Sequence, residues 1–484
     1  MKKTAEKAAD HRNHTTTNHF NQTNFKDTQN SSHLNFPTKF LPLTDIRISR
    51  PDLTETDEAS SGNRFSISPH LAKIDSIWTE SESHGQVLRF MTEDTKLDGR
   101  LIQIQGKKLV TFGSCSYLGL ELDKRLINSS QESLLNFGTQ FSSSSTYVSL
   151  GLYGTLQEKY RQIFGANVII APTTTLAHLS AIPTIVQESD AVILDQQVHS
   201  SVQLATQTLR SKARVIKTIP HNCMNTLEEQ IIKLQKSCQN IWYFLDGVYS
   251  MYGDTAPFEE LERLKVKYPS LYLYIDDAHG MSWTGFHGRG MALSRLKNLD
   301  RTVIVTSHAK SFGSAGGTII STESKIIESI RKFGSTLIFS GPIQPAVLGA
   351  SLASADIHLS DEIHLLQTIL KDKIKFRNAM FRKYDIPIIS DYGTPIAFIP
   401  VGHHASVGHL FNKLKNAGFY VNAALFPAVP QNRNGIRLTT TLHQTSSDIQ
   451  NLIEAIAHYL PEVLSDTGRS LEAVKLKFKI SNNI

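Results

Sequence analysis

The stretch Tyr274-Ile275-Asp276-Asp277-Ala278-His279-Gly280 places two acids and a histidine directly after a short apolar run. Further along the chain, a second apolar run, Val303-Ile304-Val305, leads to Lys310. Continuous apolar runs of this length predict strands that are buried on both faces of a parallel sheet. Ligands of such sheets bind just beyond the carboxyl ends of the strands. The polar residues after these two runs are therefore candidates for a binding or catalytic site.

Three other apolar runs also end in polar residues. They are 166–171, followed by Pro172 and three threonines; 191–194, followed by Asp195 and His199; and 241–245, followed by Asp246. Helical stretches such as 156–164 and 227–234 alternate with the runs, which predicts right-handed βαβ units around a mostly parallel sheet. A lone lysine after a strand is usually a solvated surface residue, and an Asp-Asp-Ala-His stretch can simply cap a helix. Five runs with polar ends favour a single active-site rim instead.

A lysine and an acid–histidine pair at this rim are the groups that pyridoxal phosphate needs. The amine of Lys310 can form a Schiff base with the aldehyde of the cofactor. A neighbouring carboxylate can keep the pyridine nitrogen protonated, so that the ring stabilises a carbanion. The sequence therefore predicts an enzyme with pyridoxal phosphate as its cofactor.

The chain of 484 residues is long enough for more than one domain, and its 40% hydrophobic content is typical of a globular protein. Residues 1–80 are polar and lack apolar periodicity, so we predict that most of them form a disordered or loosely attached extension. Residues 81–350 are predicted to form a large cofactor-binding domain, and residues 351–484 a smaller C-terminal α/β domain with a basic tail. Further predicted elements are an amphipathic helix over 85–91, a hairpin strand over 100–105 with its turn at 106–107, strands over 395–400 and 436–441, and a helix over 446–459.

The net charge of +6 is carried by the two ends of the chain. Residues 1–50 hold eight Lys/Arg against four Asp/Glu, and residues 465–484 hold four against two, so the body between them is neutral overall. A neutral body argues against a groove for nucleic acid. The three cysteines have neither paired nor metal-ligand spacing, so we predict no metal site and a reducing, cytoplasmic location. No apolar stretch has the length of a membrane span or the pattern of a secretory signal.

From about Asp98 to Tyr459 the chain resembles the α-oxoamine synthases, a family of pyridoxal-phosphate enzymes. The matching motifs follow in the order of the family: Tyr117-Leu118-Gly119-Leu120, His199-Ser200, His221-Asn222, Asp246-Gly247-Val248-Tyr249-Ser250-Met251, Asp276-Asp277-Ala278-His279-Gly280, Gly288-Arg289-Gly290, and Lys310 with Gly313, Gly316 and Gly317. Each motif alone is weak, whereas the ordered set is specific. The resemblance implies the fold of fold-type I pyridoxal-phosphate transferases, which is an α/β fold with a large, mostly parallel sheet domain and a smaller C-terminal α/β domain.

The resemblance also implies roles for the residues at the rim. Lys310 would carry the cofactor and then remove the α proton of the substrate as a general base. Asp276 would pair with the pyridinium nitrogen, and His279 would approach the phenolic oxygen of the ring. His199 would stack on the face of the ring, and Asp246 is also expected to contact the cofactor.

Other implied contacts concern the phosphate and the substrate. The backbone N–H groups of Thr173 and Thr174, at the start of a helix, would hold the phosphate together with the hydroxyl of Ser307. Ser250 would bond near the phenolic oxygen. Arg437 would clamp the carboxylate of the amino-acid substrate, because a guanidinium binds a carboxylate with two parallel hydrogen bonds.

The chain departs from the family pattern at five places, one of which is the Thr173-Thr174 stretch, where the usual glycine is missing. Cys115-Ser116 replaces an Asn-Asp pair, and 142–146, a run of four serines and a threonine, replaces a glycine-rich segment with an arginine. Tyr153 stands where the family has a histidine, and Gly341-Pro342 stands where a partner subunit often supplies a Ser or Thr to the phosphate. These changes concern the substrate and acyl-donor contacts and leave the groups for carbanion chemistry in place.

The predicted function is the condensation of an amino acid with an acyl thioester, carried by coenzyme A or a carrier protein, with loss of carbon dioxide to give an α-amino ketone. The expected assembly is a homodimer. Two alternatives remain open: an aminotransferase of the same fold, and a catalytically idle partner subunit.

The C-terminal segment Val474-Lys475-Leu476-Lys477-Phe478-Lys479-Ile480 alternates apolar and cationic residues, which is the period of a strand. We expect an edge strand or a segment docked on the body, with lysines that deter aggregation. The alternative is weak peripheral contact with anionic lipid, since each cation contributes about 1 kcal/mol near such a surface.

Overall fold

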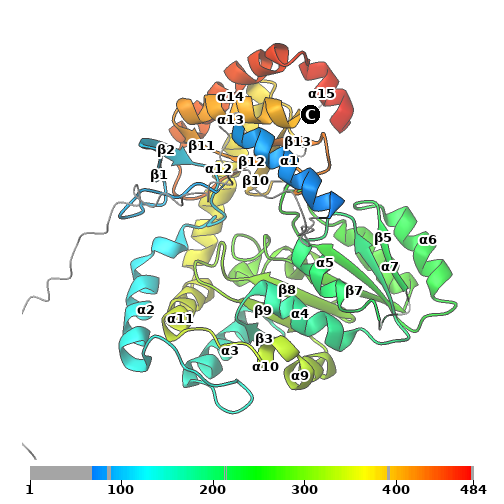
Figure 1. The fold of residues 1–484 in the computed structure, drawn as a ribbon. Helices are drawn as coiled ribbons and strands as arrows, with labels where there is room; N and C mark the ends of the chain where they lie inside the picture. The colour runs from blue at the N-terminus through cyan, green and yellow to red at the C-terminus, as the bar shows by residue number, and fades with distance from the viewer. Residues whose placement is uncertain (1–67, 84–88, 212, 214, 390–392, 481–484) are drawn as a thin grey trace, which may run out of the picture. The chain divides into compact units, whose positions relative to one another are not determined.

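The computed structural model describes residues 68–83, 89–211, 213, 215–389 and 393–480. The described residues all belong to one compact unit, Ile67–Ile484. Its main feature is a seven-stranded sheet (Figure 1). The strand order is β3 (Asn167–Ala171), β9 (Gly317–Ser321), β8 (Thr302–Ser307), β7 (Leu271–Asp276), β6 (Ile241–Asp246), β4 (Ala191–Asp195) and β5 (Val215–Ile219). Only β9 runs antiparallel to its neighbours in this sheet, so the prediction of a mostly parallel sheet is confirmed.

Helices cover both faces of this sheet, as the continuous apolar runs predict. Consecutive residues of β6, such as Tyr243 and Phe244, are fully buried and belong to two different apolar clusters. The Tyr243 cluster includes side chains of α3 (Gly151–Phe164), α6 (Met224–Leu234), α7 (Phe258–Lys267) and α11 (Pro345–Leu359). The Phe244 cluster includes side chains of α4 (Thr174–Ile185), α5 (Ser200–Gln207) and α9 (Ser324–Phe333). A strand buried on both faces gains nothing from polar residues along its length, so its polar residues collect at its ends.

The later part of the chain adds two small sheets with a buried cluster of their own. One sheet is antiparallel and consists of β10 (Ile396–Gly402), β13 (Asn434–Thr439) and β12 (Asn422–Ala424). The other joins the predicted hairpin, β1 (Leu101–Ile104) and β2 (Lys107–Thr111), to β11 (Phe419–Tyr420). Helices α13 (His404–Asn416) and α14 (Ser446–Asp466) pack in the same cluster, and the predicted helix over 446–459 is thereby confirmed.

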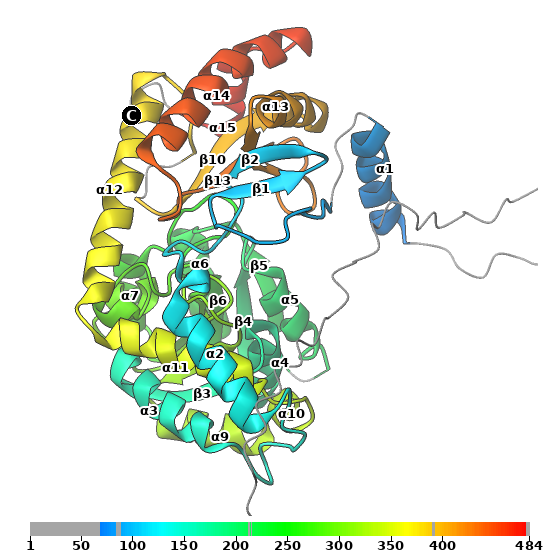
Figure 2. The same cartoon turned by 90° about the vertical axis from the view of Figure 1, so that its left-hand side faces the viewer.

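A long helix, α12 (Glu362–Lys383), runs from the region of the large sheet to the small sheets (Figures 1 and 2). The predicted boundary between the large and the small domain, at residue 350, falls inside α11. The division into two domains therefore stays a prediction, although the two regions have separate apolar clusters.

The prediction of a strand in the C-terminal tail is wrong. The segment forms helix α15 (Leu471–Phe478), whose first turn is capped by the Ser470 hydroxyl accepting from the backbone N–H of Ala473 at 3.1 Å. Val474 is buried and Phe478 packs against the same cluster, whereas Leu476 is 81% exposed. A spacing of four residues places Val474 and Phe478 on one helix face and turns Leu476 away from it, whereas a strand would place all three on the same face. The expectation that the tail docks on the body is confirmed.

The N-terminal region contains a helix that the sequence did not predict. Helix α1 (Pro69–Ser83) lies within the stretch predicted to be largely disordered or loosely attached, and its Glu80 lies 2.9 Å from His404 of α13. The rest of that stretch, residues 1–67, lies outside the described residues. The predicted helix over 85–91 is not observed at residues 89–91, and residues 84–88 are likewise outside the described ranges. Among the described helices none is long and apolar enough to cross a membrane.

Candidate active site

The carboxyl ends of neighbouring strands bring the predicted residues together. Asp246 and Asp276 are register partners at the ends of β6 and β7, and Ser307 ends β8. Lys310 follows Ser307 in a turn and is half-buried. His199 follows β4 as the N-cap of α5. Five residues from four separate segments of the sequence thus share one edge of the sheet, as the rim hypothesis predicts.

Asp276 is paired with a histidine that the sequence did not single out. His178, on α4, is fully buried, and its Nε2 lies 2.9 Å from Oδ2 of Asp276. The other ring nitrogen lies 2.8 Å from the hydroxyl of Tyr274, and Oδ1 of Asp276 accepts from the backbone N–H of Ala278 at 3.0 Å. Burial by itself raises the pKa of Asp276, but His178, His199 and Lys310 together hold that pKa below its usual range. Asp276 is therefore a buried but ionised carboxylate.

Asp246, the neighbour of Asp276 in the sheet, has the opposite tendency. Its pKa lies well above the usual range, because it is buried and because the negative charge of Asp276 is close to it. Its Oδ1 accepts from the backbone N–H of His199 at 3.0 Å. The adjacent acids therefore differ in role: Asp276 keeps the charge, while Asp246 orients the start of α5.

The imidazole of His199 is held at the first turn of α5. Its Nδ1 lies 2.6 Å from the hydroxyl of Ser201 and also accepts from the backbone N–H of that residue. Burial lowers the pKa of His199, so the ring is neutral at physiological pH. A flat, neutral ring with one nitrogen fixed is suited to lie against an aromatic cofactor.

Lys310 lies within electrostatic reach of these groups, because its charge lowers the pKa values of both Asp276 and His279. Its backbone carbonyl accepts from the N–H of Gly313 at 3.0 Å, which closes the turn. Gly313 has φ +76°, and a Cβ atom there would lie 2.7 Å from Cβ of Leu120. The turn that presents the lysine therefore requires glycine at position 313.

His279 is buried, and its Nδ1 lies 2.7 Å from the hydroxyl of Tyr117. Its backbone carbonyl accepts from the indole N–H of Trp283 at 2.6 Å. Burial lowers the pKa of His279 well below its usual value, and the charges of Lys310 and Arg437 lower it further. The ring is therefore a neutral hydrogen-bonding group at the same rim.

The proposed phosphate contacts also lie close to one another. Thr173 caps α4 by accepting from the N–H of Leu176 at 3.1 Å, and the hydroxyl of Thr174 donates to the backbone carbonyl of Thr306 at 3.3 Å. A Cβ atom at Gly317 would lie 2.9 Å from Cα of Thr174, so this close approach depends on glycine. The hydrogen bond from Thr174 to Thr306 joins the N-terminus of α4 to β8, the strand that ends at Ser307. A helix N-terminus favours an anion at such a place.

Arg437 reaches the rim from the small antiparallel sheet. It lies on β13, is 5% exposed, and its Nε donates to the backbone carbonyl of Ser250 at 2.6 Å. A terminal guanidinium nitrogen lies 3.7 Å from Sγ of Cys115, the residue that replaces the family asparagine. Ser250 therefore meets Arg437 through its backbone, and the expected contact of its hydroxyl with a cofactor stays a prediction.

The other departures from the family pattern have structural contacts. The hydroxyl of Ser144 donates to the carbonyl of Ile338 at 2.8 Å, and that of Ser145 to the carbonyl of Leu337 at 3.0 Å. The serine run thus fastens its loop to α10 (Ser335–Ile338). The hydroxyl of Tyr153 accepts from the backbone N–H of Ile343 at 2.7 Å.

These residues fit pyridoxal phosphate by their chemistry. The ionised Asp276 suits a protonated pyridine nitrogen, the amine of Lys310 suits an aldehyde, and the start of α4 suits a phosphate. The buried hydroxyls of Thr306 and Ser311, on either side of Lys310 in the sequence, have no hydrogen-bond partner within the described part of the chain. Unpaired buried hydroxyls are uncommon, and they are consistent with a polar ligand at this place. The residues that the structure describes contain no group of three or more His, Cys, Asp or Glu that could hold a metal ion.

Comparison with known proteins gives a consistent result. Residues 107–456 match the family described as aminotransferase class I and II. An 8-amino-7-oxononanoate synthase from Petrotoga mobilis is 27% identical over 374 residues, which cover 76% of this chain and 92% of that protein. A serine palmitoyltransferase from Sphingobacterium spiritivorum is 27% identical over 378 residues, covering 78% of this chain and 92% of that protein.

Among solved structures, the serine palmitoyltransferase from S. paucimobilis superposes with a TM-score of 0.74 at 23% identity. The match covers 81% of this chain and 98% of that one. The predicted fold-type I architecture is thereby confirmed. The curated relatives confirm the predicted resemblance to the α-oxoamine synthases, and with it pyridoxal phosphate as the cofactor.

Proposed function

Because the chain belongs to the aminotransferase class I and II family, we propose that it is a pyridoxal-phosphate-dependent acyltransferase that joins an amino acid to an acyl thioester. Carbon dioxide leaves, and the product is an α-amino ketone. The relatives named 8-amino-7-oxononanoate synthase and serine palmitoyltransferase support this reaction class. The observation that carries the proposal is the ionised, buried Asp276 at the same rim as Lys310.

Pyridoxal phosphate, when bound, supplies an electron sink for a carbanion at the α carbon of the amino acid. Asp276 would hold a proton on the pyridine nitrogen, because a buried, ionised carboxylate favours a cationic ring. Lys310 would bind the cofactor, and its amine would serve as the base for the α proton of the substrate. His199 and His279, whose pKa values are lowered by burial, would orient the ring without adding a charge that competes with the proton.

Arg437 is proposed to bind the carboxylate of the amino acid. Its Nε is already engaged by the carbonyl of Ser250, so its terminal nitrogens are the donors left for a substrate. The 3.7 Å contact with Cys115 is weak, and a carboxylate can displace it. The thiol at this position makes the pocket less polar than the family asparagine would.

A product screen tests the reaction. Small amino acids are incubated with acyl-CoA thioesters of short to long chain, and free thiol, carbon dioxide and products are followed by absorbance and mass spectrometry, with Lys310→Ala as the blank. Release of thiol and carbon dioxide in equal amounts, with an α-amino ketone, supports the proposal. Exchange of the amino group without thiol release makes the protein an aminotransferase. The absence of cofactor binding and turnover makes it an idle subunit.

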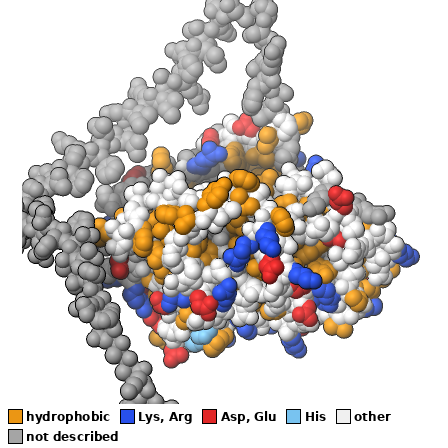
Figure 3. Space-filling model, turned by 90° about the horizontal axis from the view of Figure 1, so that it is seen from below, with side chains coloured by type: hydrophobic (Ala, Val, Ile, Leu, Met, Phe, Trp, Pro, Cys, Tyr) orange, Lys and Arg blue, Asp and Glu red, His pale blue; other side chains and the backbone are white. Residues whose placement is uncertain are grey.

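The assembly is proposed to be a homodimer. Three of the most exposed apolar side chains are Leu135 of α2 (Lys124–Phe137) at 85%, Tyr147 at 87% and Phe339 at 85%. The bond from Ser144 to Ile338 ties the loop of Tyr147 to the helix before Phe339. Figure 3 shows apolar side chains gathered in a band on the face seen from below. Burying large apolar side chains against a second copy would remove them from water.

Sedimentation velocity tests the homodimer. Tyr147→Asp combined with Phe339→Asp is expected to shift the protein from dimer to monomer, because each aspartate would be buried without a partner. Leu476→Asp is the matched control, since Leu476 is 81% exposed on α15, outside this group of residues. A double variant that sediments like the wild type would rule out this face as the interface.

The proposed location is the cytoplasm, because Cys115, Cys223 and Cys238 are all free thiols and suit reducing surroundings. Contact with anionic lipid is proposed to be weak at most. On α15, Lys475 is buried and lies 3.3 Å from Asp385, which leaves two exposed cations in the tail. Two cations contribute about 2 kcal/mol near an anionic surface, and salt screens that attraction.

A further inference from the structure

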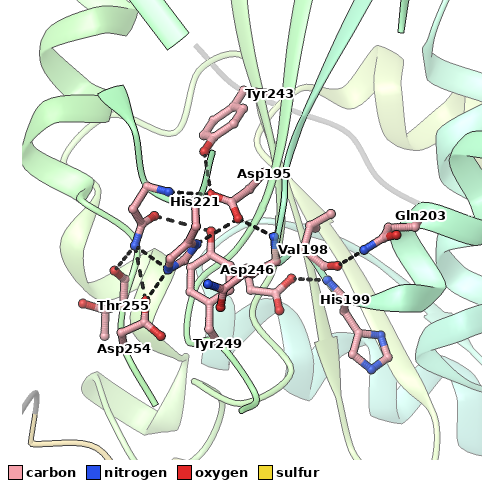
Figure 4. A network of polar contacts seen from close by, with 12 residues as sticks. Asp195, Val198, His199, Gln203, His221, Tyr243, Asp246, Tyr249, Asp254 and Thr255 are labelled. Carbon is pink, nitrogen blue, oxygen red and sulfur yellow. Dashed lines mark hydrogen bonds and ion pairs between the residues drawn. The ribbon is translucent and has the colours of Figure 1, made fainter. Parts of the chain in front are cut away.

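His221 lies between two carboxylates at the same edge of the large sheet (Figure 4). Its Nδ1 is 2.9 Å from Asp195 and its Nε2 is 2.6 Å from Asp254. An ionised carboxylate can only accept a hydrogen bond, so both ring nitrogens must donate and the ring is a cation. Burial lowers the pKa of His221, but the two carboxylates outweigh burial and raise it to about 9.

The first carboxylate fixes the turn after β4. Besides His221, Asp195 accepts from the backbone N–H of Asn222 at 2.8 Å, from that of Gln197 at 2.7 Å and from the hydroxyl of Tyr243 at 3.1 Å. Its own carbonyl accepts from the N–H of Val198 at 3.1 Å. The next residue after this turn is His199, one of the rim residues.

The second carboxylate fixes the loop after β6. The backbone carbonyl of Asp254 accepts from the N–H of Tyr249 at 2.8 Å, and Gly253 donates to the carbonyl of Tyr249 at 3.0 Å. Ser250 lies at the tip of this loop, and its carbonyl receives Nε of Arg437. The position of Arg437 at the rim is thus coupled, through the loop, to Asp254.

The remaining neighbours of the ring are polar but uncharged. The ring of Tyr249 stands edge-on at 4.4 Å between centroids. The side-chain amide of Asn222 donates to the carbonyl of Thr255 at 3.2 Å and lies 3.4 Å from Asp254. The charges that set the state of His221 are therefore Asp195 on β4 and Asp254 on the loop after β6.

We propose that protonated His221 is a positioning residue that clamps the Ser250 loop to the turn before His199 and so sets the affinity for the amino-acid substrate. Both of its ring nitrogens are paired with carboxylates, so His221 acts through Ser250 and Arg437. The proposal rests on the role of Arg437 in the proposed function. It goes further by assigning amino-acid affinity to a cation outside the pocket.

The test compares His221→Gln and Asp254→Asn with the wild type as holoenzymes. A glutamine can donate to one carboxylate only and turns its oxygen toward the other, so the loop loses one anchor. We expect the KM for the amino acid to rise about tenfold, the equivalent of 1.4 kcal/mol, while kcat changes about twofold or less. His404→Gln is the matched control, because it also removes a histidine–carboxylate pair, but one between α1 and α13.

The dependence on pH separates positioning from a general structural role. In the wild type the low KM should persist until pH rises through about 9, where His221 loses its proton. Asp254→Asn removes one of the two acids that raise this pKa, so the rise in KM should begin at least about one pH unit lower. Unchanged KM and an unchanged alkaline limb in Asp254→Asn would overturn the proposal. A fall in both kcat and melting temperature, without a shift of the alkaline limb, would also overturn the proposal.

Amino-acid binding is also measured directly, as the change in cofactor absorbance when the amino acid is added without acyl thioester. This readout does not require condensation, so it reports on the clamp even if the protein proves to be an aminotransferase. Weaker binding in His221→Gln with normal binding in His404→Gln supports the clamp. Equal binding in all three proteins overturns it, whatever the product screen shows.

Discussion

Two histidine–carboxylate clusters lie at the same edge of the large sheet, and they differ in what faces the second ring nitrogen. In the first, His178 meets Asp276 on one side and the hydroxyl of Tyr274 on the other. In the second, His221 meets a carboxylate on each side (Figure 4). The first cluster is fully buried, with exposed fractions of 0% and 4%, whereas the side chain of His221 is 20% exposed.

This difference separates a chemical role from a mechanical one. In the first cluster the hydroxyl of Tyr274 can accept from one ring nitrogen of His178, while the other nitrogen donates to Asp276 and stabilises its negative charge. Asp276 is thereby left available to a ligand at the rim. In the second cluster both N–H donors of His221 bind carboxylates, and the positive charge of the ring holds two loops together. The same residue types thus make an active-site electrostatic group in one place and a clamp in the other.

The largest effect is expected from Lys310, whose charge shifts the pKa of Asp276 in the first cluster. Lys310→Ala should reduce turnover by roughly 10⁴-fold, the upper end of what a positioned acid–base group contributes. Its melting temperature should change little, because a half-buried lysine at a turn adds little to the core. Steady-state kinetics and calorimetry check both statements. Substantial remaining turnover would show that Lys310 and the first cluster take no part in the reaction.

The next effect is expected from Asp276→Asn. The variant should still bind the cofactor, but turnover should fall by roughly 10²–10³-fold, since the amide cannot favour a protonated ring. Single-turnover kinetics with saturating amino acid measure this loss. Near-normal turnover would mean that the first cluster has no chemical role and in this respect does not differ from the His221 cluster.

A smaller effect should follow from His178→Gln, which keeps a donor toward Asp276 but removes the possibility of a positive charge. Burial then acts on Asp276 with less opposition, so its pKa rises. Activity that needs the ionised carboxylate is lost as pH falls through this pKa, and the loss should therefore begin at a higher pH than in the wild type. A shift of one pH unit corresponds to about tenfold in rate on the acid limb. The pH profile of kcat/KM decides, and an unshifted acid limb would contradict the assigned role.

The smallest effect on activity is expected at Asp277. This side chain is fully buried, and burial raises its pKa to about 8, so it is neutral at pH 7 although it directly follows the ionised Asp276. The raised pKa makes its stabilising contribution complete below the unfolded value of about 4, and that contribution is lost as pH rises through about 8.

Asp277→Asn should therefore keep activity within about twofold and flatten the fall in melting temperature between about pH 4 and pH 8. Thermal unfolding of the holoenzyme over this range is the measurement. A steeper pH dependence in the variant, or a loss of activity like that of Asp276→Asn, would contradict the distinction between the two adjacent acids.

The strands and the rim could be predicted from the sequence, because strands buried on both faces need continuous apolar runs and leave their polar residues at the ends. Residues such as Asp276 and Lys310 stand directly after such runs. The partner of Asp276 could not be predicted. His178 lies on an apolar helix, 98 positions from Asp276, and nothing local shows which strand it faces.

The prediction of a strand in the C-terminal tail was wrong for a different reason. Seven alternating residues fit both a strand and two turns of a helix, and the decision depends on tertiary packing. In the helix, Val474 and Phe478 pack against the small-sheet cluster while Leu476 is exposed, an arrangement that a strand would not give. The contacts of the serine run also depend on tertiary packing: Ser144 and Ser145 fasten a loop to α10, which lies nearly 200 residues further along the chain.

Lys310 is proposed to hold pyridoxal phosphate beside the first cluster. Borohydride reduction of the purified holoenzyme, followed by peptide mapping by mass spectrometry, tests this assignment, since reduction fixes the cofactor on the lysine that carries it. The expected result is a single modified peptide with the cofactor on Lys310, and no modified peptide from Lys310→Ala. The cofactor on another lysine, or the same labelling in Lys310→Ala, would show that Lys310 does not carry it.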